Sequence, residues 1–184
     1  MGEVISVKGA VKCLREGKVI AYPTEAVYGL GCDPGNEVAV RQILALKDRP
    51  ADAGLILISD AFERFLPWID PISRTQLDCA LATWPGPVTW LFPRHQDTPD
   101  WLAGKHQTIA LRVTEHPVCR EICAQFDGAI VSTSANPRGV EPARTAGEVD
   151  QYFGSALCGT VDGDLGGEQK PSQIRDLASG RVLR

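Results

Sequence analysis

Long apolar runs are missing from this sequence, and so is an export signal. No stretch approaches the ~18 consecutive apolar residues that a membrane-spanning helix needs. The N-terminus, from Met1 to Ser6, turns amphipathic at once and lacks the charged start and apolar centre of a signal peptide. The 184 residues, 43% hydrophobic and 23% charged, are typical of a globular domain with a sizeable core. We expect one domain over residues 1–184, in the cytoplasm and without membrane contact.

An excess of positive charge is also missing. Lys and Arg together number 19, Asp and Glu 23, and the net charge is −4. Proteins that bind nucleic acid over a broad surface are usually basic overall. Net charge does not locate individual charges, so a local basic cleft remains compatible with this composition.

The motifs of several common site classes are absent. No CxxC pair occurs, and of the six cysteines only Cys119 and Cys123 lie close together, with no histidine cluster beside them. We therefore expect small buried cysteines with reduced thiols rather than a zinc site. The absence of GxGxxG excludes a dinucleotide fingerprint, and the absence of GxSxG excludes a hydrolase nucleophile elbow. No acidic cluster suggests a dedicated metal cage.

Helical and extended patterns are interspersed along the chain. Helices are expected over residues 6–17, 36–46, 73–83, 117–126 and 145–153. Strands are expected over residues 19–22, 55–58, 88–92, 109–113 and 129–132, with short tail strands at 157–159, 173–176 and 182–183. Because residues 88–113 contain two strands and no helix, the pattern favours an α/β fold with a twisted mixed sheet over a Rossmann domain.

The first candidate site segment follows the first predicted strand and reads YPTEAVYGLGCD, from Tyr22 to Asp33. Loops at strand ends commonly carry function, and glycines allow the backbone to approach a ligand closely. Thr24 and Tyr28 lie in this segment. A plain strand-to-helix turn explains the same pattern.

The second candidate is Lys47-Asp48-Arg49-Pro50, at the end of an apolar helix. Lys47 and Arg49 are two positions apart, so in an extended segment their cations can point to one side and bind a polyphosphate. The alternative is a solvated pair that complements the C-terminus of the helix.

The third candidate is Ser132-Thr133-Ser134-Ala135-Asn136, which follows a buried strand. Hydroxyl and amide groups can hold phosphate oxygens, a carboxylate or a base edge. A serine nucleophile would need a histidine base, and the three histidines belong to no triad pattern. A serine-rich turn is the structural alternative.

Two further residues complete the candidate set. Arg112 lies in an apolar strand, and a buried arginine needs a partner, which could be a substrate carboxylate or a structural aspartate. Ser172 offers a hydroxyl at the start of a strand, where a turn is more typical than a ligand.

Taken in order, six motifs resemble one family: PTEAVYGLGCD, KDRP, WPGPVT, ALRVTEHP, STSAN and PSQIRD. The chain is similar, from residue 7 to residue 184, to the YrdC/TsaC family of L-threonylcarbamoyladenylate synthases, in particular its short single-domain bacterial type. The resemblance implies a single-domain α/β fold, with flanking helices around a deep basic cleft. It implies that L-threonine, bicarbonate and ATP are converted to threonylcarbamoyl-AMP and pyrophosphate, for the N6-threonylcarbamoyladenosine modification of tRNA.

The resemblance also implies roles for individual residues. The residues implied for threonine binding are Thr24, Tyr28, Arg112, Ser132 and Ser172. Those implied for ATP binding are Lys47, Arg49, Thr108, Ser134, Asn136 and Arg184, with Lys47 and Arg49 as the catalytic phosphate ligands. Magnesium is expected to arrive with ATP, and the product is expected to pass to threonylcarbamoyl-transfer proteins of the TsaB, TsaD and TsaE type, with weak tRNA binding by this chain.

The sequence departs from longer relatives at two places. Ala26 stands where they have a second threonine, and residues 51–58 replace an Asn-Pro-Leu segment and a histidine. Other functions compatible with the sequence are an RNA-binding protein of tRNA or rRNA maturation, a carbamoyl-transfer partner and a sugar-phosphate synthase. The last would need acidic magnesium ligands, which the sequence does not offer.

Overall fold

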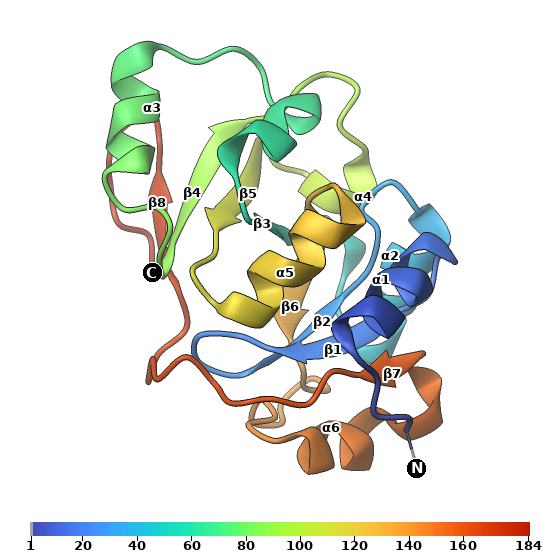
Figure 1. Cartoon of the computed structure of the whole chain (residues 1–184). Helices are drawn as coiled ribbons and strands as arrows, with labels where there is room; N and C mark the ends of the chain where they lie inside the picture. Colours follow the sequence, from blue (N-terminus) through green and yellow to red (C-terminus); the bar gives the residue numbers. More distant parts are fainter. Residues whose placement is uncertain (1) are drawn as a thin grey trace.

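Eight strands form one mixed sheet in the computed structural model, which describes residues 2–184. The strands are β1 (Ile20–Pro23), β2 (Tyr28–Gly31), β3 (Ile56–Ser59), β4 (Val88–Pro93), β5 (Thr108–Val113), β6 (Ile130–Ser134), β7 (Gly159–Thr160) and β8 (Gln173–Asp176). Their order across the sheet is β7-β1-β2-β6-β3-β5-β4-β8 (Figure 1). The expected twisted α/β sheet with flanking helices is confirmed. Met1, the first residue of the expected domain, lies outside the described residues.

The pairing of the strands explains why the chain shows no strict alternation of strand and helix. β1–β2, β2–β6, β3–β6 and β4–β5 are antiparallel, whereas β1–β7, β3–β5 and β4–β8 are parallel. β6 lies between β2 and β3 and joins the two halves of the sheet. Strands that are distant in sequence therefore meet at the centre of the molecule.

Six α-helices and three short 3-10 helices connect the strands. The α-helices are α1 (Val7–Arg15), α2 (Glu37–Leu46), α3 (Arg74–Leu81), α4 (Asp100–Ala103), α5 (Pro117–Phe126) and α6 (Ala146–Phe153). The 3-10 helices are η1 (Ala51–Ala53), η2 (Phe62–Trp68) and η3 (Gly154–Ala156). Four helices begin where the sequence predicts, because a side chain accepts a hydrogen bond from the first turn; the caps are Ser6, Asn36, Ser73 and Thr145.

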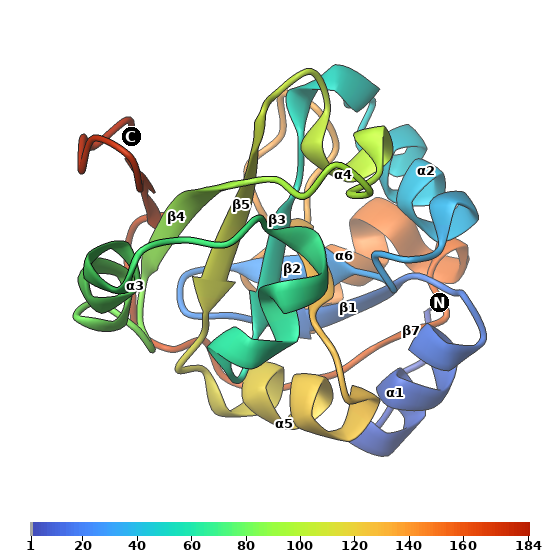
Figure 2. The ribbon, with the colours of Figure 1, turned by 90° about the horizontal axis from the view of Figure 1, so that it is seen from above.

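The helices cover the sheet in two layers, each with its own core. α1 and α5 lie side by side below the sheet in Figure 2, and Leu14 and Ile122 pack there against Ile20 of β1. Ala21, the next residue of β1, belongs to the other core, with Ile43 of α2. Alternate residues of a strand face opposite sides, so β1 is buried on both.

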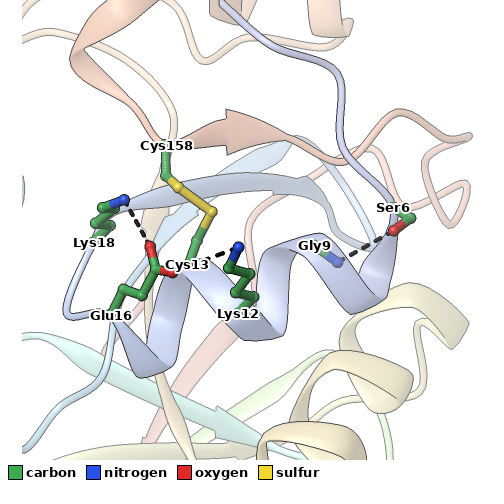
Figure 3. The surroundings of a disulfide bond; sticks show 7 residues. All are labelled: Ser6, Gly9, Lys12, Cys13, Glu16, Lys18 and Cys158. Atoms are coloured by element: carbon green, nitrogen blue, oxygen red, sulfur yellow. Dashed lines mark hydrogen bonds and ion pairs between the residues drawn. A yellow bond between two sulfur atoms is a disulfide. The ribbon is translucent and has the colours of Figure 1, made fainter.

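The cysteines differ from the expectation in one pair. Cys13 on α1 and Cys158, just before β7, form a disulfide with a Cα–Cα distance of 6.1 Å (Figure 3). The expectation of six reduced thiols is therefore wrong. Because β7 pairs with β1, the sheet brings together two cysteines separated by 145 positions, which spacing along the chain could not reveal.

The remaining cysteines agree with the expectation of small buried residues in three cases, Cys32, Cys119 and Cys123, whereas Cys79 is exposed. Within residues 2–184, no group of three or more His, Cys, Asp or Glu side chains could hold a metal ion. Over the same residues, no helix is long and apolar enough to cross a membrane.

Candidate active site

One cavity of about 460 Å³ gathers side chains from segments that are far apart in sequence. The turn after β1, parts of β3, β5 and β6, and residues around β8 all contribute to its wall. Nine of the eleven residues selected from the sequence line it: Thr24, Tyr28, Arg49, Thr108, Arg112, Ser132, Ser134, Ser172 and Arg184. Lys47 and Asn136 are not in its described lining.

Two serines of β6 reach the cavity because they are two positions apart on one strand. Ser132 and Ser134 therefore point to the same face of the sheet. Ser134 pairs with Gly29 of the neighbouring β2. A Cβ atom at position 29 would lie 3.2 Å from Thr24 Cγ2 and 3.5 Å from Ser132 Oγ, so glycine leaves room for these two hydroxyl-bearing side chains to approach. The glycines of the YGLG segment thus form a strand, β2, rather than the loop that the sequence suggested.

Arg112 finds a structural partner in Glu25. Arg112 Nη1 donates to Glu25 Oε2 at 2.6 Å, and Thr114 Oγ1 donates to Glu25 Oε1 at 2.6 Å. The side chains of Arg112 and Glu25 are only 9% and 4% exposed. Burial alone would raise the pKa of Glu25, but the Arg112 charge and the Thr114 hydroxyl outweigh it, and the pKa is lowered. Glu25 is therefore a carboxylate at neutral pH.

Glu25 uses only part of the Arg112 guanidinium. Arg112 Nε is buried and has no hydrogen-bond partner among the described residues, and Arg112 lines the cavity. A buried, unpaired donor is costly, so a ligand that accepts from this guanidinium would be favoured. The structural partner is thus a glutamate rather than the expected aspartate, and it leaves room for a substrate carboxylate as well.

Three further cations line the cavity. Arg49, Lys170 and Arg184 all belong to the lining. Arg49 Nη2 donates to the Gly54 carbonyl at 2.9 Å, while its Nε is buried without a partner among the described residues. Burial lowers the pKa of Arg49, and the nearby charge of Arg184 lowers it further, but a guanidinium keeps its proton at neutral pH. Two like charges held this close suit an anionic ligand between them. The deep basic cleft of the resemblance stays a prediction.

Lys47 is buried and does not belong to the described lining of the cavity. It is 6% exposed. Its ammonium donates to the carbonyl of Ser134, to the carbonyl of Asn136 at 2.9 Å and to Asn136 Oδ1 at 3.1 Å. Lys47 and Arg49 have different partners, the Asn136 carbonyl and the Gly54 carbonyl. The segment is not extended, because Lys47 has a helical backbone conformation and Asp48 has a positive φ of 47°.

Residues 161–171 run past the turn between β1 and β2 (Figure 1) and hydrogen-bond to it. Gly166 N donates to Thr24 O at 3.1 Å, and Glu168 N donates to Glu25 O at 2.9 Å. The Tyr28 hydroxyl donates to Gly163 O at 2.9 Å. Tyr28 therefore lines the cavity with its hydroxyl already engaged.

Ser172 and the segment that departs from longer relatives also reach the cavity. The hydroxyls of Ser172 and Thr89 lie 2.9 Å apart, and the Ser172 carbonyl accepts from Arg184 Nη2 at 3.3 Å. Residues 53–56, within the departing segment, belong to the lining, as does Ala26.

Sequence reasoning missed three polar residues of the lining, Glu25, His106 and Lys170. Glu25 could have been found, because it lies inside the PTE motif beside Thr24. His106 and Lys170 lie outside the predicted helices and strands and outside the six motifs, so no pattern singled them out.

Comparisons with known proteins give a consistent result. The family model Sua5/YciO/YrdC, described as telomere recombination, matches residues 12–184. The threonylcarbamoyl-AMP synthase of Pseudomonas savastanoi pv. phaseolicola is 50% identical over 178 residues, which cover 97% of this chain and 96% of the relative. That of Coxiella burnetii is 46% identical over 179 residues, with the same coverage.

Solved structures extend the comparison to the fold. P. abyssi Sua5, solved in complex with L-threonine, is 32% identical and superimposes with a TM-score of 0.87, covering 97% of this chain and 53% of that one. E. coli YciO, at 23% identity and a TM-score of 0.81, covers 100% of this chain and 91% of that one, and shows the fold alone.

Proposed function

The chain belongs to the Sua5/YciO/YrdC family, and from this premise we propose that it is a threonylcarbamoyl-AMP synthase. The relatives of that name cover 97% of the chain at about 50% identity. The substrates are L-threonine, bicarbonate and ATP, and the products are threonylcarbamoyl-AMP and pyrophosphate. The threonylcarbamoyl group is destined for the N6-threonylcarbamoyladenosine of tRNA.

The chemistry is a nucleotidyl transfer that needs no nucleophile from the protein. Bicarbonate takes up a proton and loses water to give carbon dioxide. The threonine amine attacks the carbon dioxide and gives a carbamate and a proton. A carbamate oxygen then attacks the α-phosphorus of ATP, and pyrophosphate leaves with the electron pair of the broken P–O bond. Catalysis consists of positioning and of neutralising charge on the phosphates. This matches a cavity lined by cations and hydroxyls.

The threonine end is the part of the cavity around Arg112. The substrate carboxylate accepts hydrogen bonds from the guanidinium donors that Glu25 leaves free. Ser132 and Ser172, which line the same cavity, supply hydroxyls for threonine, and Ser172 lies toward the ATP end, because its carbonyl accepts from Arg184. Thr24 and Tyr28 shape the threonine end. Because Glu25 already balances the charge of Arg112, a zwitterionic amino acid fits here better than a doubly charged anion.

The ATP end is the part around Arg49, Lys170 and Arg184, whose charges offset those of the phosphates. Thr108 and Ser134 supply hydroxyls on the same lining. Magnesium arrives with ATP, held by phosphate oxygens and water. Glu25, the acidic residue of the described lining, is engaged by Arg112 and Thr114 and is not offered to the ion.

The place of the reaction follows from its product. Threonylcarbamoyl-AMP is a mixed anhydride that water destroys, so it is passed to transfer proteins of the TsaB, TsaD and TsaE type, in the cytoplasm where tRNA is modified. Weak tRNA binding accompanies this transfer. No observation favours RNA binding as the main function, and the net charge of −4 opposes it.

One observation carries the proposal: Arg112, whose Nε has no partner among the described residues, and the Arg49–Arg184 pair line a single cavity. The test is pyrophosphate release from ATP, measured with and without L-threonine and bicarbonate. We expect release only when both are present, and its near loss in Arg49→Ala. Arg74→Ala is the matched control, because Arg74 is 82% exposed on α3. Pyrophosphate release without threonine, or salt-sensitive RNA binding without any release, would refute the proposal.

A further inference from the structure

We propose that Lys47 is a positioning residue, which does not bind the phosphates but fixes residues 134–136 so that Ser134 faces the cavity. This deepens the proposed function and rests on it only for the identity of the ligand. The family resemblance implied that Lys47 and Arg49 act alike on the phosphates. The geometry separates the two residues.

The first observation is that the hydrogen-bonding capacity of Lys47 is exhausted. An ammonium group has three donors. All three are matched by acceptors from residues 134–136, namely the Ser134 carbonyl, the Asn136 carbonyl and Asn136 Oδ1. Burial, followed by the charge of Arg49, lowers the pKa of Lys47 to about 8. To reach a phosphate, Lys47 would have to break three bonds and leave two carbonyls unsatisfied.

The second observation is that Lys47 anchors an ordered network. Asn136 Oδ1 accepts from Lys47 and also from the Ser134 hydroxyl, at 2.6 Å. Asn136 Nδ2 donates to the Val140 carbonyl at 2.7 Å. Ala135 N donates to the Tyr28 carbonyl at 2.8 Å, which ties the same residues to β2. Lys47 thus sets the position of Asn136, and Asn136 sets the orientation of the Ser134 hydroxyl.

The third observation is the contrast with Arg49, two positions away. The positive φ of Asp48 turns the chain between them. Arg49 lines the cavity and has an unpaired Nε, whereas Lys47 donates to the backbone carbonyls of Ser134 and Asn136. One cation is free to meet an anion and the other is not.

The test compares Lys47→Met with Arg49→Met as matched variants. Two readouts need no turnover: affinity for inorganic pyrophosphate by calorimetry, and backbone hydrogen exchange of residues 134–140. For Lys47→Met we expect exchange to rise by about tenfold or more, since a charge-assisted network is lost, with pyrophosphate affinity changed less than about threefold. For Arg49→Met we expect pyrophosphate affinity to fall by about tenfold or more, with exchange unchanged.

Conservative variants sharpen the test. Lys47→Arg keeps the charge but cannot fit the same three acceptors in a buried site, so it should resemble Lys47→Met in exchange. Asn136→Ala should reproduce the exchange of Lys47→Met, and the double variant should add little, because both residues act in one network. The proposal would be overturned if Lys47→Met lost pyrophosphate affinity tenfold without a change in hydrogen exchange, and if Lys47→Arg restored that affinity.

A crystal structure of the unaltered protein with pyrophosphate covers the case in which Lys47→Met fails to fold. Lys47 Nζ should remain on the carbonyls of Ser134 and Asn136, and its movement onto a phosphate oxygen would overturn the proposal. Absence of threonine-dependent pyrophosphate release would refute the proposed function instead, and would not affect the positioning role of Lys47.

Discussion

Replacement of Glu25 by alanine should destabilise the protein strongly, because it leaves Arg112 as a buried, unbalanced charge. Arg112 is 9% exposed and Glu25 4% exposed, and their atoms are 2.6 Å apart. Removal of one partner from such a pair costs about 3–5 kcal/mol. For a domain of this size each kcal/mol lowers Tm by ~2–4 °C, so we expect a fall of roughly 10 °C in thermal unfolding.

An exposed ion pair with the same geometry provides the control. Lys105 and Asp52 are also 2.6 Å apart, but their side chains are 80% and 45% exposed. Asp52→Ala should change stability by less than ~1 kcal/mol, because water screens the pair. A similar cost for Glu25→Ala and Asp52→Ala would refute the assignment of a buried, essential pair.

The double variant Glu25→Leu/Arg112→Met separates stability from binding. It should regain most of the stability, since neither charge remains buried alone. It should still fail to bind threonine in calorimetry.

The pH dependence of stability supplies a further check. The folded state lowers the pKa of Glu25 below its ordinary value of 4.5, so the carboxylate contributes stability above that pH. The advantage of the unaltered protein over Glu25→Gln should fade as pH falls through the lowered pKa.

Four other measurements test the site and its surroundings. Arg112→Met should raise the KM for threonine far more than the KM for ATP in the pyrophosphate assay. A larger rise in the KM for ATP would show that ATP, rather than threonine, binds near Arg112. Ellman's reagent should label Cys79 in the folded protein, four thiols after unfolding and six after reduction, and six before reduction would exclude the disulfide. Folding lowers the pKa of Lys47 from 10.5 to about 8, so the folded state loses that proton at a lower pH than the unfolded state. In urea unfolding, the unaltered protein should therefore gain stability relative to Lys47→Met as pH rises from about 8 to 10.5. A stability difference that does not change with pH would contradict the burial of Lys47. Gly166→Ala should cost ~1–3 kcal/mol, because a Cβ atom there would lie 2.9 Å from Glu25 Cα, and an unchanged Tm would show that residues 161–171 are not held tightly.

Local signals predicted much of the fold. Helix starts at Ser6, Asn36, Ser73 and Thr145 depend on the residues that follow directly, so the sequence was sufficient. β2 was missed, because YGLG contains two glycines and forms a strand only through pairing with β1 and β6. The short strand expected at 157–159 lies instead at Gly159–Thr160, and Val182 contributes an isolated bridge to Arg175 rather than a strand.

The candidate site was predictable in its membership but less so in its internal contacts. Motifs identified nine residues that line the cavity. They did not show that Glu25 would meet Arg112, 87 positions away, since that contact depends on the path of the whole sheet. Nor did they show the direction of Lys47, which follows from the backbone angles at residues 47 and 48.

The central position of β6 has a consequence for how the chain folds. Its neighbours β2 and β3 end at Gly31 and Ser59, but β6 begins only at Ile130. During synthesis on the ribosome, the edges of β2 and β3 that pair with β6 stay unpaired until β6 has emerged. Contacts between residues so far apart in sequence also slow folding. Ser132 and Ser134, which line the cavity, lie on this late strand, so the site cannot assemble before the two halves of the sheet have joined. Truncation before residue 130 should therefore yield an aggregation-prone chain, rather than a smaller folded domain.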